Sequence, residues 1–195
     1  SGLNVSYKEI LNFCCNFTPM AASKQLDLFP SGKLSVTLQR LCHELLETYG
    51  DFHDTVILGA QPKGVYLSRR IHSMLKGYRP DSNILHGELD TTFFRDDFRM
   101  REKPLQANKT RIDFLVENKR VVLLDDVLYT GRTIRAAMNE IFDYGRPASI
   151  KLVCLIDVGQ RQLPIQTDLV GATLTVERGK KVKLSGPSPL LLSVD

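Results

Sequence analysis

The stretch 121–133 constrains the fold of this chain more than any other. It begins with four consecutive apolar residues, continues with Asp125 and Asp126, and after three more residues reaches Thr130-Gly131-Arg132-Thr133. A strand that is apolar at every position is buried on both faces, as the central strands of parallel sheets are. We therefore predict a central strand over 120–125, two carboxylates at its carboxyl end, and a helix that begins at Gly131.

Strands and helices are expected to alternate along the chain. Apolar spacing and glycine stops predict helices over 33–49, 64–76 and 131–144. Apolar, often β-branched runs predict further strands over 55–59, 84–94 and 149–157. This order predicts an α/β fold with a central, mostly parallel sheet flanked by helices. The segment 95–119 has no strong period and is expected to be a functional loop, and the residues after 157 indicate short strands and turns.

The composition excludes several classes of protein. Of 195 residues, 43% are hydrophobic and 25% are charged, which is a globular balance. No apolar run approaches the roughly 20 residues that a membrane-spanning helix needs, so we expect no membrane contact. The four cysteines form neither a disulfide framework nor a C-x-x-C pair, and no secretory signal is visible, so we expect a cytoplasmic protein. The net charge of +4 suits a phosphate-bearing ligand or weak nucleic-acid contact without deciding between them.

The residues after the central strand suit a sugar phosphate. Ligands of open α/β sheets bind beyond the carboxyl ends of the strands, and a helix N-terminus offers free N–H groups and a favourable dipole to a phosphate. Two adjacent carboxylates can accept hydrogen bonds from a vicinal diol, so together these features indicate a ribose 5-phosphate. Neither a P-loop nor a G-x-G-x-x-G fingerprint is present. The alternative is a purely structural strand with Thr130 as a helix cap and a solvated acid pair.

The sequence resembles the type I phosphoribosyltransferases and, more closely, the PyrR family of pyrimidine-operon attenuation regulators that are also uracil phosphoribosyltransferases. The residues that carry the likeness are the run 125–138, Gly87-Glu88-Leu89-Asp90, Arg95-Asp96-Asp97, Gly145-Arg146-Pro147 and the run 161–165. The resemblance implies a phosphoribosyltransferase domain over 33–195. Residues 1–32, part of which could stem from an expression vector, are expected to be an N-terminal appendage.

The resemblance also implies how phosphoribosyl pyrophosphate (PRPP) would bind. Asp125 and Asp126 would face the ribose hydroxyls as catalytic residues, with Asp125 beside a Mg²⁺ that is carried mainly by PRPP. Arg95 would be a catalytic cation at the start of a flexible hood loop that closes over PRPP. The 5-phosphate would be bound by Tyr129, Thr130, Gly131, Arg132 and Thr133.

The pyrophosphate of PRPP would meet a loop that departs from the family pattern. This loop is Gln61, Pro62, Lys63 and Gly64, whereas family members usually have a different tripeptide, often with an arginine. Pro62 removes one N–H donor and makes a cis bond after Gln61 more accessible than it is for other residues. Lys63 is expected to take the leaving group; the alternative is an exposed turn lysine.

Tyr129 bears on the choice of base. Purine-using relatives have an aspartate at this position, and a neutral phenol cannot accept a proton in its place near pH 7. Uracil is therefore the expected acceptor, and a purine enzyme is disfavoured. The implied base-binding residues are Val127, Leu128, Asp157 and Val158, the last of which replaces an arginine common in the family.

Two functional readings remain open at this point. The first is an enzyme that makes UMP and pyrophosphate from uracil and PRPP. The second is an RNA-binding regulator that senses UMP or PRPP with weak or no catalysis. His43 and Arg161 match RNA-binding positions of the family, but several neighbouring positions lack a basic or hydroxyl residue, so weakened RNA binding is expected. The family also implies a homodimer or a higher homo-oligomer.

Overall fold

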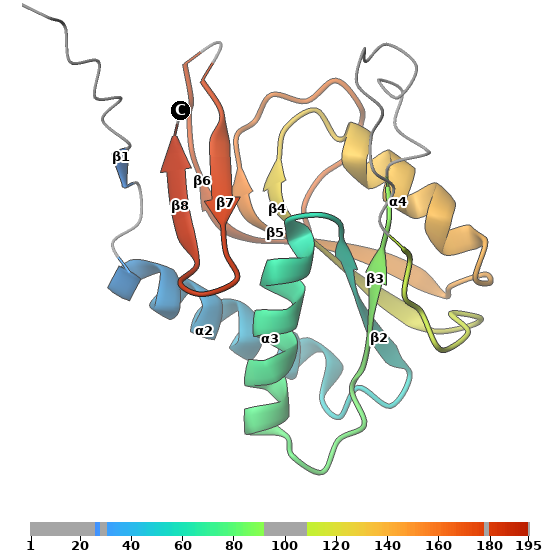
Figure 1. The fold of residues 1–195 in the computed structure, drawn as a ribbon. Coiled ribbons are helices and arrows are strands. Elements are labelled where there is room, and N and C mark those ends of the chain that lie inside the picture. The colour runs from blue at the N-terminus through green and yellow to red at the C-terminus, as the bar shows by residue number, and fades with distance from the viewer. Residues whose placement is uncertain (1–25, 28–30, 92–108, 178–179, 195) are drawn as a thin grey trace, which may run out of the picture.

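The computed structural model describes residues 26–27, 31–91, 109–177 and 180–194. Their strands form two sheets (Figure 1). The larger is a five-stranded parallel sheet in the order β3-β2-β4-β5-β6. Its strands are β2 (Thr55–Ala60), β3 (Leu85–Leu89), β4 (Arg120–Leu128), β5 (Ser149–Asp157) and β6 (Leu169–Thr173).

Strand β4 occupies the centre of this sheet, as the apolar run predicts. It pairs with β2 on one side and with β5 on the other. The predicted end at residue 125 is wrong, because Val127 and Leu128 continue the ladder opposite Ile156 and Asp157 of β5. The two carboxylates therefore lie within the strand. Similarly, β3 ends at Leu89 rather than at 94; Asp90 and Thr91 are outside the strand, and 92–94 lie outside the described residues.

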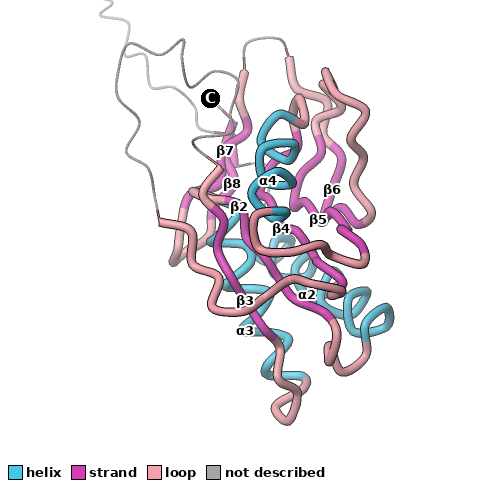
Figure 2. The backbone as a smooth tube through the Cα atoms, turned by 90° about the vertical axis from the view of Figure 1, so that its right-hand side faces the viewer, coloured by secondary structure: helices cyan, strands magenta, loops and turns pink. Residues whose placement is uncertain are grey.

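The helices cover both faces of the sheet. They are α2 (Ser31–Tyr49), α3 (Gly64–Tyr78) and α4 (Arg132–Phe142), close to the predicted spans. Successive side chains of β4 alternate between two cores, because a strand has a period of two. Val122 and Leu124 pack with α2 and α3, whereas Val121 and Leu123 pack with α4. The α/β architecture is thus confirmed, and Figure 2 shows the strands side by side with the helices around them.

A second, antiparallel sheet stands above α2 (Figure 1). It is made of β7 (Val182–Ser185) and β8 (Leu191–Val194), with β1 (Leu26–Asp27) on the other side of β8. Val182, Leu184 and Leu192 are buried in the same core as α2 and α3. Residues 26 and 27 belong to the stretch expected to be an appendage, yet they pair with a C-terminal strand. Among the described residues no helix is long and apolar enough to cross a membrane.

Candidate active site

A pocket of about 600 Å³ lies at the carboxyl end of β4, where parallel sheets bind their ligands. It brings together two segments that the sequence singled out. From the loop after β2 come Gln61, Pro62 and Lys63. From β4 and the start of α4 come Asp125, Asp126, Val127, Tyr129, Thr130, Arg132 and Thr133. Sequence reasoning missed a third wall, which is formed by Val182, the first residue of β7, and by Lys180 and Lys181 just before it.

The acid pair forms the floor of this pocket. Asp125 is buried, and its Oδ1 accepts a hydrogen bond from the Asp126 N–H at 2.9 Å. Burial raises the pKa of Asp126, while the hydrogen bond with Asp125 and the positive charge of Lys63 act in the opposite direction. Asp125 and Asp126 thus bring two carboxyl groups in different environments into the same pocket.

Gly64 lets the loop after β2 approach this acid pair. A Cβ atom at Gly64 would lie 2.8 Å from the Leu124 carbonyl oxygen and 3.0 Å from Oδ1 of Asp125. Only glycine fits at such a distance without a shift of the backbone. Helix α3 consequently begins directly against β4, close to Leu124 and Asp125.

The loop itself is fixed on its other side. The Gln61 N–H donates to the Leu89 carbonyl at 2.8 Å, and the Gln61 side-chain amide donates to the Lys109 carbonyl at 3.0 Å. The bond between Gln61 and Pro62 is cis, the form that the proline makes accessible. Lys63 lines the pocket immediately before α3, so its ammonium group is placed to meet an anion there.

The opposite end of the pocket is the start of α4. Gly131 precedes the helix with a φ of +87°, which only glycine adopts readily. The Thr130 hydroxyl accepts from the Arg132 N–H at 3.3 Å, and the Thr130 carbonyl accepts from the N–H groups of Gln162 and Leu163. Loop 160–165 therefore braces a helix N-terminus whose dipole and hydroxyls favour a phosphate.

The Tyr129 hydroxyl is bonded to the small sheet. It donates to the Val182 carbonyl at 3.3 Å and accepts a short hydrogen bond from the Val182 N–H. Burial raises the pKa of Tyr129, and the nearby Asp126 carboxylate acts in the same direction. The Tyr129 ring lines the pocket, but its hydroxyl serves to hold β7 beside β4.

Of the four predicted base-binding residues, Leu128, Asp157 and Val158 are not among the residues that line this pocket. Leu128 and Val158 are buried, and the Val158 N–H donates to the Leu128 carbonyl at 3.2 Å. The Asp157 carboxylate accepts from the Gly159 N–H at 2.8 Å and from the Arg161 guanidinium. Val127 does line the pocket.

The two predicted RNA-contacting residues lie in different settings. The Arg161 guanidinium donates to the Ile165 and Tyr129 carbonyls at 2.7 and 3.1 Å as well as to Asp157, so it fastens the loop beneath the site. His43 is exposed on α2, with its ring 4.9 Å from that of Tyr78. Arg95, the predicted catalytic cation, lies outside the described residues.

Solved structures share this fold. A purine phosphoribosyltransferase from Pyrococcus horikoshii matches with a TM-score of 0.55 at 22% identity, over 74% of this chain and 84% of that chain. A hypoxanthine phosphoribosyltransferase from Staphylococcus aureus matches with a TM-score of 0.58 at 21% identity, over 77% and 78%. At such identities the likeness concerns the fold alone.

Sequence comparison specifies the family. Residues 28–185 match the phosphoribosyl transferase domain model, so fold and site define a phosphoribosyltransferase domain. A bifunctional protein PyrR from Pseudomonas fluorescens is 46% identical over 72% of this chain and 81% of the relative. Another PyrR protein, from Geobacter sulfurreducens, is 45% identical over 74% and 81%. The chain belongs to the PyrR family, which confirms the resemblance seen in the sequence.

The family implies Mg²⁺, and the donor set is consistent with it. No group of three or more metal-binding side chains occurs in the part of the chain that the structure describes. Mg²⁺ is commonly held by one or two carboxylates together with waters and substrate phosphates. Asp125 and Asp126, side by side in the pocket, fit that pattern, in which the substrate brings most of the ligands.

Proposed function

We propose that this chain transfers the phosphoribosyl group of PRPP to uracil, which yields UMP and pyrophosphate. The observation that supports the proposal is the single pocket in which Asp125 and Asp126 lie together with two segments suited to anions. On one side lies the N-terminus of α4, and on the other lies Lys63 with the N-terminus of α3. This combination suits a ribose with a phosphate at one end and a pyrophosphate at the other.

Different residues of the pocket would bind the 5-phosphate, the ribose and the pyrophosphate of PRPP. The hydroxyls of Thr130 and Thr133 and the N–H groups of α4 would hold the 5-phosphate. Asp125 and Asp126 would orient the ribose hydroxyls and stabilise the positive charge that develops as the bond between the anomeric carbon and pyrophosphate breaks. The pyrophosphate would leave with the bonding electrons towards Lys63. Uracil N1 would form the new bond to the anomeric carbon, and its proton would pass to the departing pyrophosphate.

Mg²⁺ would supply charge neutralisation for the leaving pyrophosphate when PRPP brings it into the site. Asp125 and Asp126 would hold it on the protein side. Their role as hydrogen-bond acceptors for the ribose does not depend on the ion.

The choice of uracil is supported by Tyr129. Because its hydroxyl both donates to and accepts from Val182, it is not available to act on a purine ring nitrogen. The acceptor would lie against the Tyr129 ring and near Val182, at the wall that the small sheet provides. Lys181 is exposed at this wall and would favour an acceptor that carries carbonyl oxygens.

A regulatory role is the second candidate, and it is favoured by the relatives that are named bifunctional. His43, exposed on α2, would be available to RNA. Arg161 is less available, because its guanidinium is bonded within loop 157–165. We therefore propose weak RNA binding beside the enzymatic activity, and a homodimer or higher homo-oligomer as the active form.

Formation of UMP from uracil, PRPP and Mg²⁺ tests the proposal, with hypoxanthine and guanine as parallel acceptors. Of the three bases, only uracil is expected to be converted to its nucleotide. Asp125→Asn together with Asp126→Asn should lower kcat by about 100-fold or more, since the charge stabilisation at the ribose is lost. A double variant that folds and keeps most of its activity would disprove the assigned ribose site. Failure of wild-type turnover with every base, together with tight RNA binding, would favour the regulator.

A further inference from the structure

A second pocket, of about 250 Å³, adjoins the first at the loop after β2. Gln61 and Pro62 line both pockets, so this loop separates them. The remaining walls of the second pocket come from α3, β3 and the segment that begins at residue 109. The charged residues among them are Arg69, Glu88, Lys109 and Arg111.

The charge of the second pocket is predominantly positive. Among the described residues that line it, Glu88 is the one acid, and it faces three cations. The Glu88 carboxylate is engaged by Arg69, whose nitrogens lie 2.5 and 2.6 Å from Oε1. Lys109 and Arg111 thus contribute two positive charges that the lining acid does not balance.

Both cations extend from a backbone that is held firmly in place. The Arg111 N–H and carbonyl are bonded to the Glu88 carbonyl and N–H, at 2.8 and 2.9 Å. The Lys109 carbonyl accepts from Gln61 at 3.0 Å. Between them, the Thr110 hydroxyl accepts from the Asp90 N–H and donates to Glu140 at 2.7 Å. An anion entering here would meet cations whose main chain needs little reordering, which lowers the entropic cost of binding.

We propose that this second pocket binds a small polyvalent phosphate anion, either pyrophosphate or orthophosphate, at a site separate from the nucleotide pocket. Guanidinium forks match phosphate oxygens in geometry and charge. A volume of about 250 Å³ lies below the range of about 300–1,000 Å³ that is typical of pockets for drug-sized ligands. An inorganic anion therefore fits the pocket better than a whole nucleotide.

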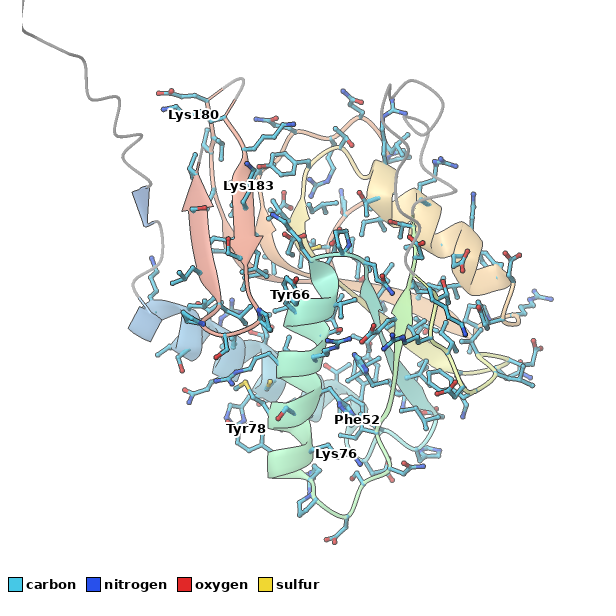
Figure 3. The ribbon with its side chains drawn as sticks, in the orientation of Figure 1. Phe52, Tyr66, Lys76, Tyr78, Lys180 and Lys183 are labelled. Carbon is cyan, nitrogen blue, oxygen red and sulfur yellow. The ribbon has the colours of Figure 1, made fainter. Side chains whose placement is uncertain are left out.

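Calorimetric titration of the full chain with pyrophosphate, and separately with orthophosphate, tests the proposal at constant ionic strength without Mg²⁺. The combined variant Lys109→Gln with Arg111→Gln should weaken one binding event by about tenfold or more, because charge-assisted hydrogen bonds are lost. Lys76→Gln with Arg79→Gln is the matched control, since it removes the same charge. Lys76 lies at the end of α3 opposite to Tyr66, which lines the pocket (Figure 3). This control should bind as the wild type does.

Lys63→Gln distinguishes anion binding in the second pocket from anion binding in the first, because Lys63 lines the first pocket and not the second. It should weaken pyrophosphate binding there and leave the second site unchanged. The proposal is overturned if Lys109→Gln with Arg111→Gln binds both anions normally, or if the control pair loses as much affinity. Should the double variant unfold, Arg111→Lys keeps the charge without the fork, and unchanged affinity for both anions would then overturn the proposal. Of pyrophosphate and orthophosphate, the anion whose binding the Lys109 and Arg111 substitutions weaken more is the ligand of the second pocket.

Discussion

A single residue decides how closely the loop after β2 approaches the acid pair. At Gly64 the backbone of α3 contacts Leu124 and Asp125, and a methyl group has no room. The sequence predicted Gly64 as part of the pyrophosphate loop, but it did not reveal this close contact. Contact distances depend on how helix and strand pack in three dimensions, which a linear pattern does not encode.

Gly64→Ala is expected to push α3 away from β4. The overpacking should lower the free energy of unfolding by about 1–3 kcal/mol and raise the KM for PRPP by about tenfold or more, because small displacements in a site are costly. Steady-state kinetics and thermal melts measure both effects. Gly77→Ala, in the same helix, is the control, since a Cβ there meets nothing within 4 Å. It should be neutral or slightly stabilising. Equal behaviour of the two variants would rule out the close-contact explanation.

At the scale of elements, long periodic segments were predicted well and short ones poorly. Strand β4 and the three helices carry enough apolar spacing to be recognised. Strands β1, β7 and β8 have two to four residues each, too few for a period to stand out. Lys180 and Lys181 reach the pocket only because β7 folds back towards β4, a long-range arrangement that the local sequence does not contain.

The hydroxyl of Tyr129 is the polar connection that we expect to hold β7 beside the site. Tyr129→Phe removes both of its hydrogen bonds with Val182, which should cost about 1 kcal/mol of stability. The KM for uracil should rise more than the KM for PRPP, because β7 borders the proposed base position. Tyr78→Phe is the control; the Tyr78 hydroxyl makes no hydrogen bond among the described residues. If the KM for uracil and the KM for PRPP rose equally, the hypothesis that β7 borders the base position in particular would be wrong.

For the whole molecule, the pH dependence of the folding stability should be influenced by a pair of histidines, His72 of α3 and His86 of β3. The His72 and His86 rings stack with centroids 5.0 Å apart, and Nε2 of His86 lies 2.9 Å from the Ser68 hydroxyl. Burial lowers the pKa of His86 to about 4, and the neighbouring His72 and Arg69 charges act in the same direction against Glu88. The folded protein therefore resists protonation of His86.

The sign of the resulting pH dependence follows from linkage. The pKa of His86 is lowered from 6.5 in the unfolded chain to about 4 in the folded one. Below pH 6.5 the unfolded chain binds a proton that the folded protein does not, so stability is full above pH 6.5 and falls as the pH drops towards 4. Thermal melts between pH 7.5 and 5 should show a decrease in Tm that is smaller in His86→Gln. An identical decrease in the variant would remove His86 as the cause.

The antiparallel sheet also makes the chain suitable for circular permutation. Leu26 of β1 lies opposite Val194 of β8, so the first and last described strands are direct neighbours. In a chain made without residues 1–25 and 195, a hairpin linker of about two to five residues would join Val194 to Leu26 in the antiparallel sense the strands already have. New ends could open in the exposed turn at 79–81, away from both pockets. Such a rearranged chain should fold and keep both pockets, which would show that the order of the segments matters less than their packing.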